Sequence, residues 1–172
     1  MRVTTGSCAV LVGNLSDMTT FETPQDLPYN RGPVADPEAF AAETGAASWL
    51  FLCGDEFAAM EGGISYDQVQ AAVDASVNVV SDPPSVLDMN LARRHIAALD
   101  ELARPTAVTC RAGPRASAVV YLYAGLQAGA SADEVLARAE ADEAPFYGFD
   151  EYKAWVAAGL AEFGADGASA EG

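Results

Sequence analysis

Lysine is nearly absent from this sequence, and basic residues as a whole are scarce. Nine Lys and Arg residues stand against 25 Asp and Glu, and Lys153 is the only lysine. The formal net charge is therefore −16. Such a surface repels polyanions and anionic bilayers, so we expect neither nucleic acid nor a membrane as a partner. A small anion would need a local basic pocket inside this negative field.

Long hydrophobic runs are also missing. No stretch approaches the roughly 18 apolar residues that a membrane-spanning helix requires. The apolar run CAVLV at residues 8–12 is too short for the hydrophobic region of a secretory signal peptide. We therefore expect no signal peptide, and a location in the cytoplasm or in the reducing interior of an organelle.

Cysteine and histidine are too few for a disulfide framework or a zinc site. The three cysteines are Cys8, Cys53 and Cys110, the only histidine is His95, and no CxxC pair occurs. This pattern argues against both kinds of site, so we predict no metal and no cofactor. Cys8 and Cys53 lie in the apolar segments SCAVLV and WLFLC, where cysteine usually acts as a small buried hydrophobic residue.

What the sequence does contain is the pattern of one α/β domain. Hydrophobic residues make up 51% of 172 residues, which is enough for the core of a single domain. Strands are predicted at 47–53, 77–80 and 106–110. Helices are predicted at 37–44, 65–76, 84–103, 115–129, 131–142 and 150–163. A long loop is predicted at 16–37 and a flexible tail at 165–172. Strands that alternate with helices predict a three-layer fold with a mostly parallel central sheet flanked by helices.

Local signals mark several of these helix ends. Pro37 has the early helical position that proline favours, and Gly45 can end the same helix. The pairs Ser65–Gln68 and Ser131–Glu134 have the spacing of capping boxes. The helix at 115–129 is almost entirely apolar, which predicts a central position in the fold.

The most informative segment is PTAVTCRAGPRAS, residues 105–117. Cys110 ends the strand, and a short loop leads into the apolar helix. Ligands of open α/β sheets bind beyond the carboxyl ends of the strands. Backbone N–H groups of such a loop can form an anion nest at the positive end of the helix, which also lowers the pKa of a cysteine thiol. We therefore predict that Cys110 is a reactive nucleophile.

The other residues of the loop suit this chemistry. Gly113 permits backbone conformations that a side chain would forbid, and Pro114 restricts the loop. Arg115 can present a planar fork to an oxyanion or thio-oxyanion, and Arg111 adds positive charge. The predicted anion-binding loop comprises Arg111, Ala112, Gly113, Pro114, Ala116 and Ser117.

The segment CRAGPR resembles the active-site loop of rhodanese-type sulfurtransferases and of the dual-specificity-phosphatase-like fold. It looks most like the beta-lactamase-hydrolase-like, phosphatase-like family, whose loop has the form Cys-Arg-x-Gly-x-Arg and whose members are often labelled sulfurtransferases. The resemblance covers residues 105–142, including VLARAEADE, and not the first 80 residues. It implies Cys110 as nucleophile and Arg115 as the binding arginine.

Two departures from the family pattern and the length of the loop bear on the reaction. Thr109 stands where many relatives have histidine, and Ala116 where phosphatases often have serine or threonine. Phosphatases of this kind have five residues between cysteine and arginine, whereas four separate Cys110 from Arg115, as in the tighter rhodanese pocket. The first hypothesis is therefore a sulfurtransferase that carries a persulfide on Cys110 and accepts a small anionic or thiol substrate.

Two further hypotheses use the same loop. A dual-specificity-phosphatase-like hydrolase would need a general acid. Asp82 lies 28 residues before Cys110, a distance that resembles that family's, and Asp88 is the second choice. Alternatively, Asp82 only begins a turn, and Ser85 or Asp88 caps a helix. The third hypothesis is a catalytically inactive domain that binds an anion or a protein partner.

The remaining candidates are predicted to be structural. His95 falls on the apolar side of its helix, where a buried, hydrogen-bonded histidine is commoner than a catalytic one. Five aromatic residues near the end of the chain are predicted to pack the last helix onto the core. They are Phe146, Tyr147, Phe149, Tyr152 and Trp155.

Overall fold

The structure is a computed structural model that describes residues 21–82 and 87–171, with backbone alone at 81–82 and 165–171. Cys8 and Ser85 lie outside the described residues, as does the beginning of the predicted loop at 16–37. No helix in the described part of the chain is both long enough and apolar enough to span a bilayer.

Three parallel strands form the sheet, in the order β2-β1-β3. They are β1 (Ser48–Cys53), β2 (Ala75–Asp82) and β3 (Thr106–Thr109). Ser48 of β1 pairs with Ala75 on one side and with Thr106 on the other. The predicted parallel sheet is thus confirmed. β2 is longer than the predicted strand at 77–80.

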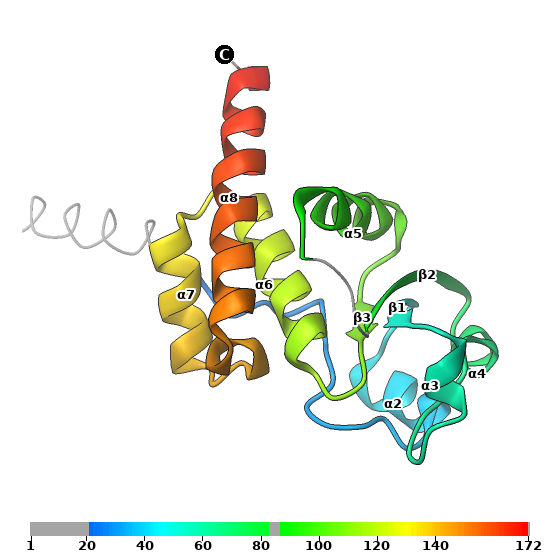
Figure 1. Cartoon of the computed structure of the whole chain (residues 1–172). Coiled ribbons are helices and arrows are strands. Elements are labelled where there is room, and N and C mark those ends of the chain that lie inside the picture. The colour runs from blue at the N-terminus through cyan, green and yellow to red at the C-terminus, as the bar shows by residue number, and fades with distance from the viewer. Residues whose placement is uncertain (1–20, 83–86, 172) are drawn as a thin grey trace, which may run out of the picture.

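Helices cover both faces of this sheet, as Figure 1 shows. On one face lie α2 (Pro37–Thr44), α3 (Asp55–Ala58) and α4 (Tyr66–Ala72). On the other face lie α5 (Met89–Glu101), α6 (Pro114–Ala128) and α8 (Asp150–Glu171), with α7 (Ala132–Ala141) and the short 3-10 helix η1 (Pro145–Gly148) packed on α6 and α8. The three-layer α/β fold predicted from the sequence is confirmed.

Two hydrophobic cores result from the alternation of side chains along β1. Trp49, Phe51 and Cys53 point into the core beneath α2, α3 and α4. Leu50 and Leu52 point into the larger core beneath α5, α6 and α8. All six residues of β1 are buried, so Cys53 is the small core residue that its apolar context predicts.

Most helix ends agree with the prediction. Gly45 ends α2 at a φ of 70°, and both predicted capping boxes, Ser65–Gln68 and Ser131–Glu134, are formed. The prediction of a helix at 65–76 is wrong at its end, because α4 stops at Ala72 and Ala75 already pairs with Ser48 of β1. Pairing with β1 therefore overrides the local helical preference of residues 75 and 76.

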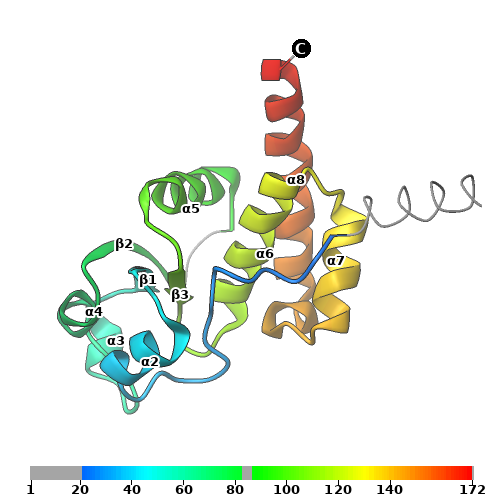
Figure 2. The ribbon, with the colours of Figure 1, turned by 180° about the vertical axis from the view of Figure 1, so that it is seen from behind.

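The predicted long loop has an unexpected role at the edge of the sheet. The N–H groups of Thr106 and Val108 donate to the carbonyls of Asp26 and Pro28, at 3.0 and 2.9 Å, and Tyr29 forms a parallel bridge to Val108. Figure 2 shows segment 21–36, in blue, passing α6 on its way to this edge. Residues 26–30 thus act as a rudimentary fourth strand beside β3.

Helix α6 is the centre of the larger core. All of its residues from Arg115 to Tyr123 are buried. α8 packs closely on it, since a Cβ on Gly159 would lie 2.8 Å from Leu122. α8 continues to Glu171, through the segment for which the sequence predicts a flexible tail; that flexibility stays a prediction. The loop that precedes α6 is therefore attached to a rigid part of the molecule.

Candidate functional site

Cys110 lies where β3 ends and the turn into α6 begins. Its Sγ accepts hydrogen bonds from the backbone N–H groups of Gly113 and Ala116, at 3.2 and 3.3 Å. The residue is 3% exposed. Two amide dipoles and the amino end of α6 thus face the sulfur, and this field stabilises a thiolate relative to a thiol.

Gly113 has a backbone conformation that the turn requires. Its φ is 121°, which lies in the region that favours glycine. A Cβ at this position would come within 2.3 Å of the backbone carbonyl oxygen of Asn30. Glycine is therefore required here both by the backbone conformation of the turn and by the close approach of the Asn30 backbone.

Arg115 projects from the first turn of α6 into the protein. It is 5% exposed, and within the described residues its Nε and Nη1 have no hydrogen-bond partner. Its guanidinium carbon lies 5.5 Å from the centroid of the Tyr152 ring. Buried donors of a cation that lack acceptors are unfavourable. An oxyanion bound within reach of the guanidinium would provide the missing acceptors.

The other predicted loop residues have varied positions. Arg111 and Pro114 are partly buried, and Ala112 is exposed with its carbonyl accepting from the N–H of Gly32 at 2.7 Å. Ser117 is buried, and its Oγ donates to the carbonyl of Pro114 and accepts from the N–H of Phe146, both at 3.0 Å. The Ser117 hydroxyl therefore joins α6 to η1.

Asn30 is a member of the site that the sequence analysis missed. Its Oδ1 accepts from the N–H of Cys110 at 3.2 Å, and its Nδ2 donates to the carbonyls of Cys110 and Gly32, at 3.0 and 2.9 Å. The side chain is 2% exposed. A single asparagine in a turn-rich segment usually signals a turn, so nothing in the sequence distinguishes it.

The two general-acid candidates differ in what surrounds them. The backbone of Asp82 ends β2 opposite Cys53, at the carboxyl edge of the sheet and two strands from β3, or about 10 Å across the sheet. Asp88 is the N-cap of α5, because its Oδ1 accepts from the N–H of Leu91 at 2.8 Å. The alternative interpretation of Asp88 as a helix cap is therefore confirmed.

His95 is buried and hydrogen-bonded, as predicted. It is 1% exposed, its Nδ1–H donates to the carbonyl of Leu91 at 2.9 Å, and its ring meets the edge of Trp155. Burial, followed by the positive charges of Arg115 and Arg94, lowers the pKa of His95 to about 3. The imidazole is therefore neutral at pH 7.

The aromatic residues near the end of the chain mostly pack as predicted. Phe146 and Trp155 are buried, and Tyr147 and Tyr152 are partly buried against the core. Phe149 is the exception, with 46% of its surface exposed and its edge against the Tyr152 ring. Tyr152 thus contacts both Arg115 and Phe149.

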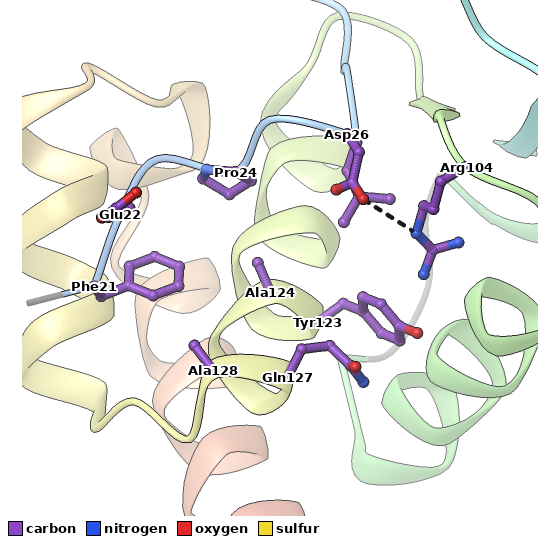
Figure 3. A pocket seen from close by; sticks show the side chains of 10 residues that line it. Phe21, Glu22, Pro24, Asp26, Arg104, Tyr123, Ala124, Gln127 and Ala128 are labelled. Carbon is purple, nitrogen blue, oxygen red and sulfur yellow. Dashed lines mark ion pairs between the residues drawn. The ribbon is translucent and has the colours of Figure 1, made fainter. Parts of the chain in front are cut away.

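A cavity of about 580 Å³ lies elsewhere, between the segment that starts at Phe21 and the end of α6 (Figure 3). Its lining shares no residue with the Cys110 loop. Arg104, in its wall, pairs with Asp26 at 3.9 Å and donates to the carbonyls of Leu99 and Leu102. Arg104 of this cavity is thus engaged in holding the end of α5. Nor do the described residues bring three Cys, His, Asp or Glu side chains together in a way that could hold a metal ion.

Solved structures with a similar fold were found by comparison. A putative phosphatase from Neisseria meningitidis has a TM-score of 0.60 and 14% identity, over 82% of this chain and 98% of its own. A putative phosphatase from Shewanella putrefaciens has a TM-score of 0.57 and 18% identity, over 84% and 93%. The chain has a phosphatase-like fold.

A second structure of a Shewanella putrefaciens putative phosphatase gives a TM-score of 0.54 at 19% identity, over 84% of this chain and 90% of its own. No family model and no curated protein matches this chain. At these identities the likeness shows the phosphatase-like fold alone. It agrees with the phosphatase-like part of the resemblance stated above, and gives no support to the rhodanese part.

Proposed function

We propose that the protein is a phosphatase-like hydrolase in which the Cys110 thiolate is the nucleophile and Arg115 binds the substrate oxyanion. The observation that carries this proposal is the convergence of two backbone N–H groups on Cys110 Sγ at the start of α6. The first turn of the same helix also carries the buried Arg115, whose Nε and Nη1 have no hydrogen-bond partner among the described residues. The phosphatase-like fold supports a phosphatase reaction, since the similar solved structures are described as putative phosphatases.

The reaction would proceed in two steps. The Cys110 thiolate attacks the phosphorus of a phosphomonoester, so that an S–P bond forms and the P–O bond to the leaving group breaks. A general acid gives the leaving oxygen its proton. Water then attacks the phosphocysteine and returns a proton to the same acid, so that the S–P bond breaks, inorganic phosphate is released and the thiolate is restored. Loop N–H groups and Arg115 stabilise the negative charge of the phosphoryl oxygens in both steps.

Asp82 is the proposed acid. Its backbone lies at the carboxyl edge of the sheet, where ligands of open α/β sheets bind. Asp88 is less suited, because its carboxylate caps α5. Hydrolysis of an aryl phosphate should depend less on Asp82 than hydrolysis of an alkyl phosphate, because a leaving phenoxide needs little help from a general acid.

A sulfurtransferase is the second candidate, favoured by the four-residue spacing between Cys110 and Arg115. Here the thiolate would attack the outer sulfur of a donor such as thiosulfate, sulfite would leave, and a persulfide would remain on Cys110. A nucleophilic acceptor such as cyanide would then take that sulfur as thiocyanate. No general acid is required, so this reaction would not depend on Asp82.

Four variants of the whole chain separate these reactions. We expect hydrolysis of p-nitrophenyl phosphate by the native protein, its loss in Cys110→Ser, and a decrease of about 10² or more in kcat/KM for Arg115→Lys, because the planar fork is lost. Asp82→Asn should reduce turnover of an alkyl phosphate more than that of the aryl phosphate. Asp88→Asn is the matched control and should change the turnover of neither the alkyl phosphate nor the aryl phosphate.

The trapped intermediate provides the deciding measurement. Mass spectrometry of the peptide containing Cys110 should show a phosphoryl group after rapid quenching with substrate. One added sulfur atom after thiosulfate exposure would instead support the sulfurtransferase. Hydrolysis that persists in Cys110→Ser would refute Cys110 as the nucleophile. The absence of both modifications and of both activities would refute the enzymatic proposals and favour an inactive anion-binding domain.

A further inference from the structure

The support of Cys110 comes from a segment 80 residues earlier in the chain, at Asn30. Parallel pairing beside β3 follows a regular alternation here: the N–H groups of Thr106 and Val108 donate to the carbonyls of Asp26 and Pro28. Continuing that alternation, the next N–H is that of Cys110 and the next residue is Asn30. At this step the acceptor is the Asn30 side chain and not its backbone carbonyl.

This exchange of acceptor has a geometric reason. The backbone carbonyl of Asn30 lies against Gly113, only 2.3 Å from where a Cβ would stand. It is therefore directed at the turn and not at the N–H of Cys110. The side-chain amide occupies the place in the ladder that the backbone has left, and its Nδ2 also binds the carbonyl of Cys110. Both backbone polar groups of Cys110 are held by one buried side chain.

We propose that Asn30 is a positioning residue for Cys110, whose side-chain amide fixes the Cys110 backbone so that Sγ faces the N–H groups of Gly113 and Ala116. The catalytic consequence rests on the proposed function, whereas the effect on the sulfur does not. Without the amide, the N–H of Cys110 loses its acceptor where water has little access, and the turn relaxes toward other partners. The two hydrogen bonds to the sulfur then lengthen, and the thiolate loses stabilisation.

Asn78 offers a matched control within the same sheet. Its Nδ2 donates to the carbonyls of Phe51 and Cys53, at 2.9 and 3.0 Å, and so bridges the irregular end of β1. The chemistry is the same as at Asn30: a side-chain amide holds the backbone of a cysteine at the carboxyl end of a parallel strand. The difference is that Cys53 belongs to the core beneath α2, α3 and α4, whereas Cys110 belongs to the larger core on the other face of the sheet.

The test compares alkylation of Cys110 by iodoacetamide across pH 5 to 10 in the full chain. Mass spectrometry of the peptide that contains Cys110 separates it from Cys8 and Cys53. We expect the native thiol to titrate below the ordinary value of about 8.5, and Asn30→Ala to raise its pKa by about one unit. Asn78→Ala should lower the melting temperature and leave the titration of Cys110 unchanged. If Asn30→Ala fails to fold, Asn30→Ser, which cannot reach both backbone groups, is measured instead with the same expectation.

The outcomes are distinct from those of the proposed function. An unchanged titration of Cys110 in the Asn30 variant, or an equal shift in Asn78→Ala, would overturn the inference, even if the native protein hydrolyses phosphate esters. A selective shift in a protein without hydrolytic activity would support the positioning role and refute the hydrolase. If the protein is a hydrolase and Asn30 positions Cys110, kcat for aryl phosphate at pH 6 should be lower in Asn30→Ala than in the native protein. It should recover partly at higher pH, because the fraction of Cys110 present as thiolate then increases.

Discussion

His95 and Arg115 are basic side chains close enough for the charge of one to influence the titration of the other. The neutral imidazole donates to the carbonyl of Leu91 and contacts the edge of Trp155, whose indole N–H in turn donates to the carbonyl of Asp88 at 3.0 Å. A neutral side chain at this position adds no second positive charge to the interior that already contains Arg115. Charge repulsion between the imidazole and the buried Arg115 guanidinium is thereby avoided.

The depressed pKa of His95 predicts a pH dependence of stability. The folded-state pKa of about 3 is below the ordinary value of 6.5, so between these values the unfolded chain binds more protons than the folded one. The free energy of unfolding should therefore fall as pH drops below 6.5, with a slope approaching about 1.4 kcal/mol per pH unit from this group. Urea unfolding between pH 5 and 7 measures it.

His95→Gln serves as the comparison, because glutamine does not titrate. Its stability should decrease less steeply over this pH range, in which the acidic residues remain mostly ionised. Identical slopes in the two proteins would contradict the assignment of a buried neutral imidazole to this position.

Gly113 gives a second prediction about a single residue. In Gly113→Ala the added Cβ would meet the carbonyl of Asn30 in a backbone conformation that alanine avoids, so the turn must change. We expect loss of most aryl-phosphate turnover and a lower melting temperature. Gly129→Ala is the control: its φ is 69° with no atom within 4 Å of the new Cβ, so it should cost about 1 kcal/mol and leave activity intact.

At the scale of the helices and strands, the start of α5 allows the structural role of Asp88 to be tested apart from a catalytic one. Asp88→Ala removes the side-chain acceptor from the N–H of Leu91 and should reduce the free energy of unfolding by about 1 kcal/mol. Turnover of phosphate esters should be retained, because the carboxylate is needed by the helix and not by the reaction. Thermal unfolding and steady-state kinetics on the same samples test both statements; a loss of kcat without a loss of stability would restore Asp88 as an acid candidate.

The ends of the helices show which structural features can be predicted from local sequence alone. Pro37 and Gly45 bound α2 as predicted, and the Ser131–Glu134 capping box starts α7, because a cap is satisfied by residues within one turn. The boundary between α4 and β2 is different. Residues 75 and 76 join β2 because β1 is there to pair with them, and no local pattern contains that information.

The candidate site likewise contains residues that the local sequence predicts and residues whose role depends on tertiary contacts. Cys110, Gly113 and Arg115 stand out because the strand, turn and helix that position them are contiguous in sequence. Asn30 is invisible to such an analysis, since its importance arises from the chain returning to the edge of β3 after the fold has formed. Ser117 belongs to the predicted loop, yet its hydroxyl is bound between Pro114 and Phe146, contacts that only the packing of η1 creates.

At the scale of the whole molecule, the charge of −16 predicts a salt dependence of stability. The described residues form four ion pairs, most of them partly exposed to solvent. Like charges that remain uncompensated repel one another in the folded state, and added salt screens that repulsion. The melting temperature should therefore rise when NaCl increases from about 0.02 to 0.5 M. A constant or falling melting temperature would show that the ion pairs outweigh the repulsion. NaCl is preferred to sulfate or phosphate, which could bind beside Cys110.

The buried guanidinium of Arg115 lacks acceptors for its Nε and Nη1, so the binding of an oxyanion there should increase the stability of the folded protein. An oxyanion that completes its partners is bound by the native state alone, so the ligand shifts the folding equilibrium by mass action. Each tenfold excess of such an anion over its dissociation constant adds about 1.4 kcal/mol to the unfolding free energy. Ligands can therefore be found from stability alone: a panel of small oxyanions ranked by the rise in melting temperature that each causes would identify which anion the protein prefers before any turnover is known.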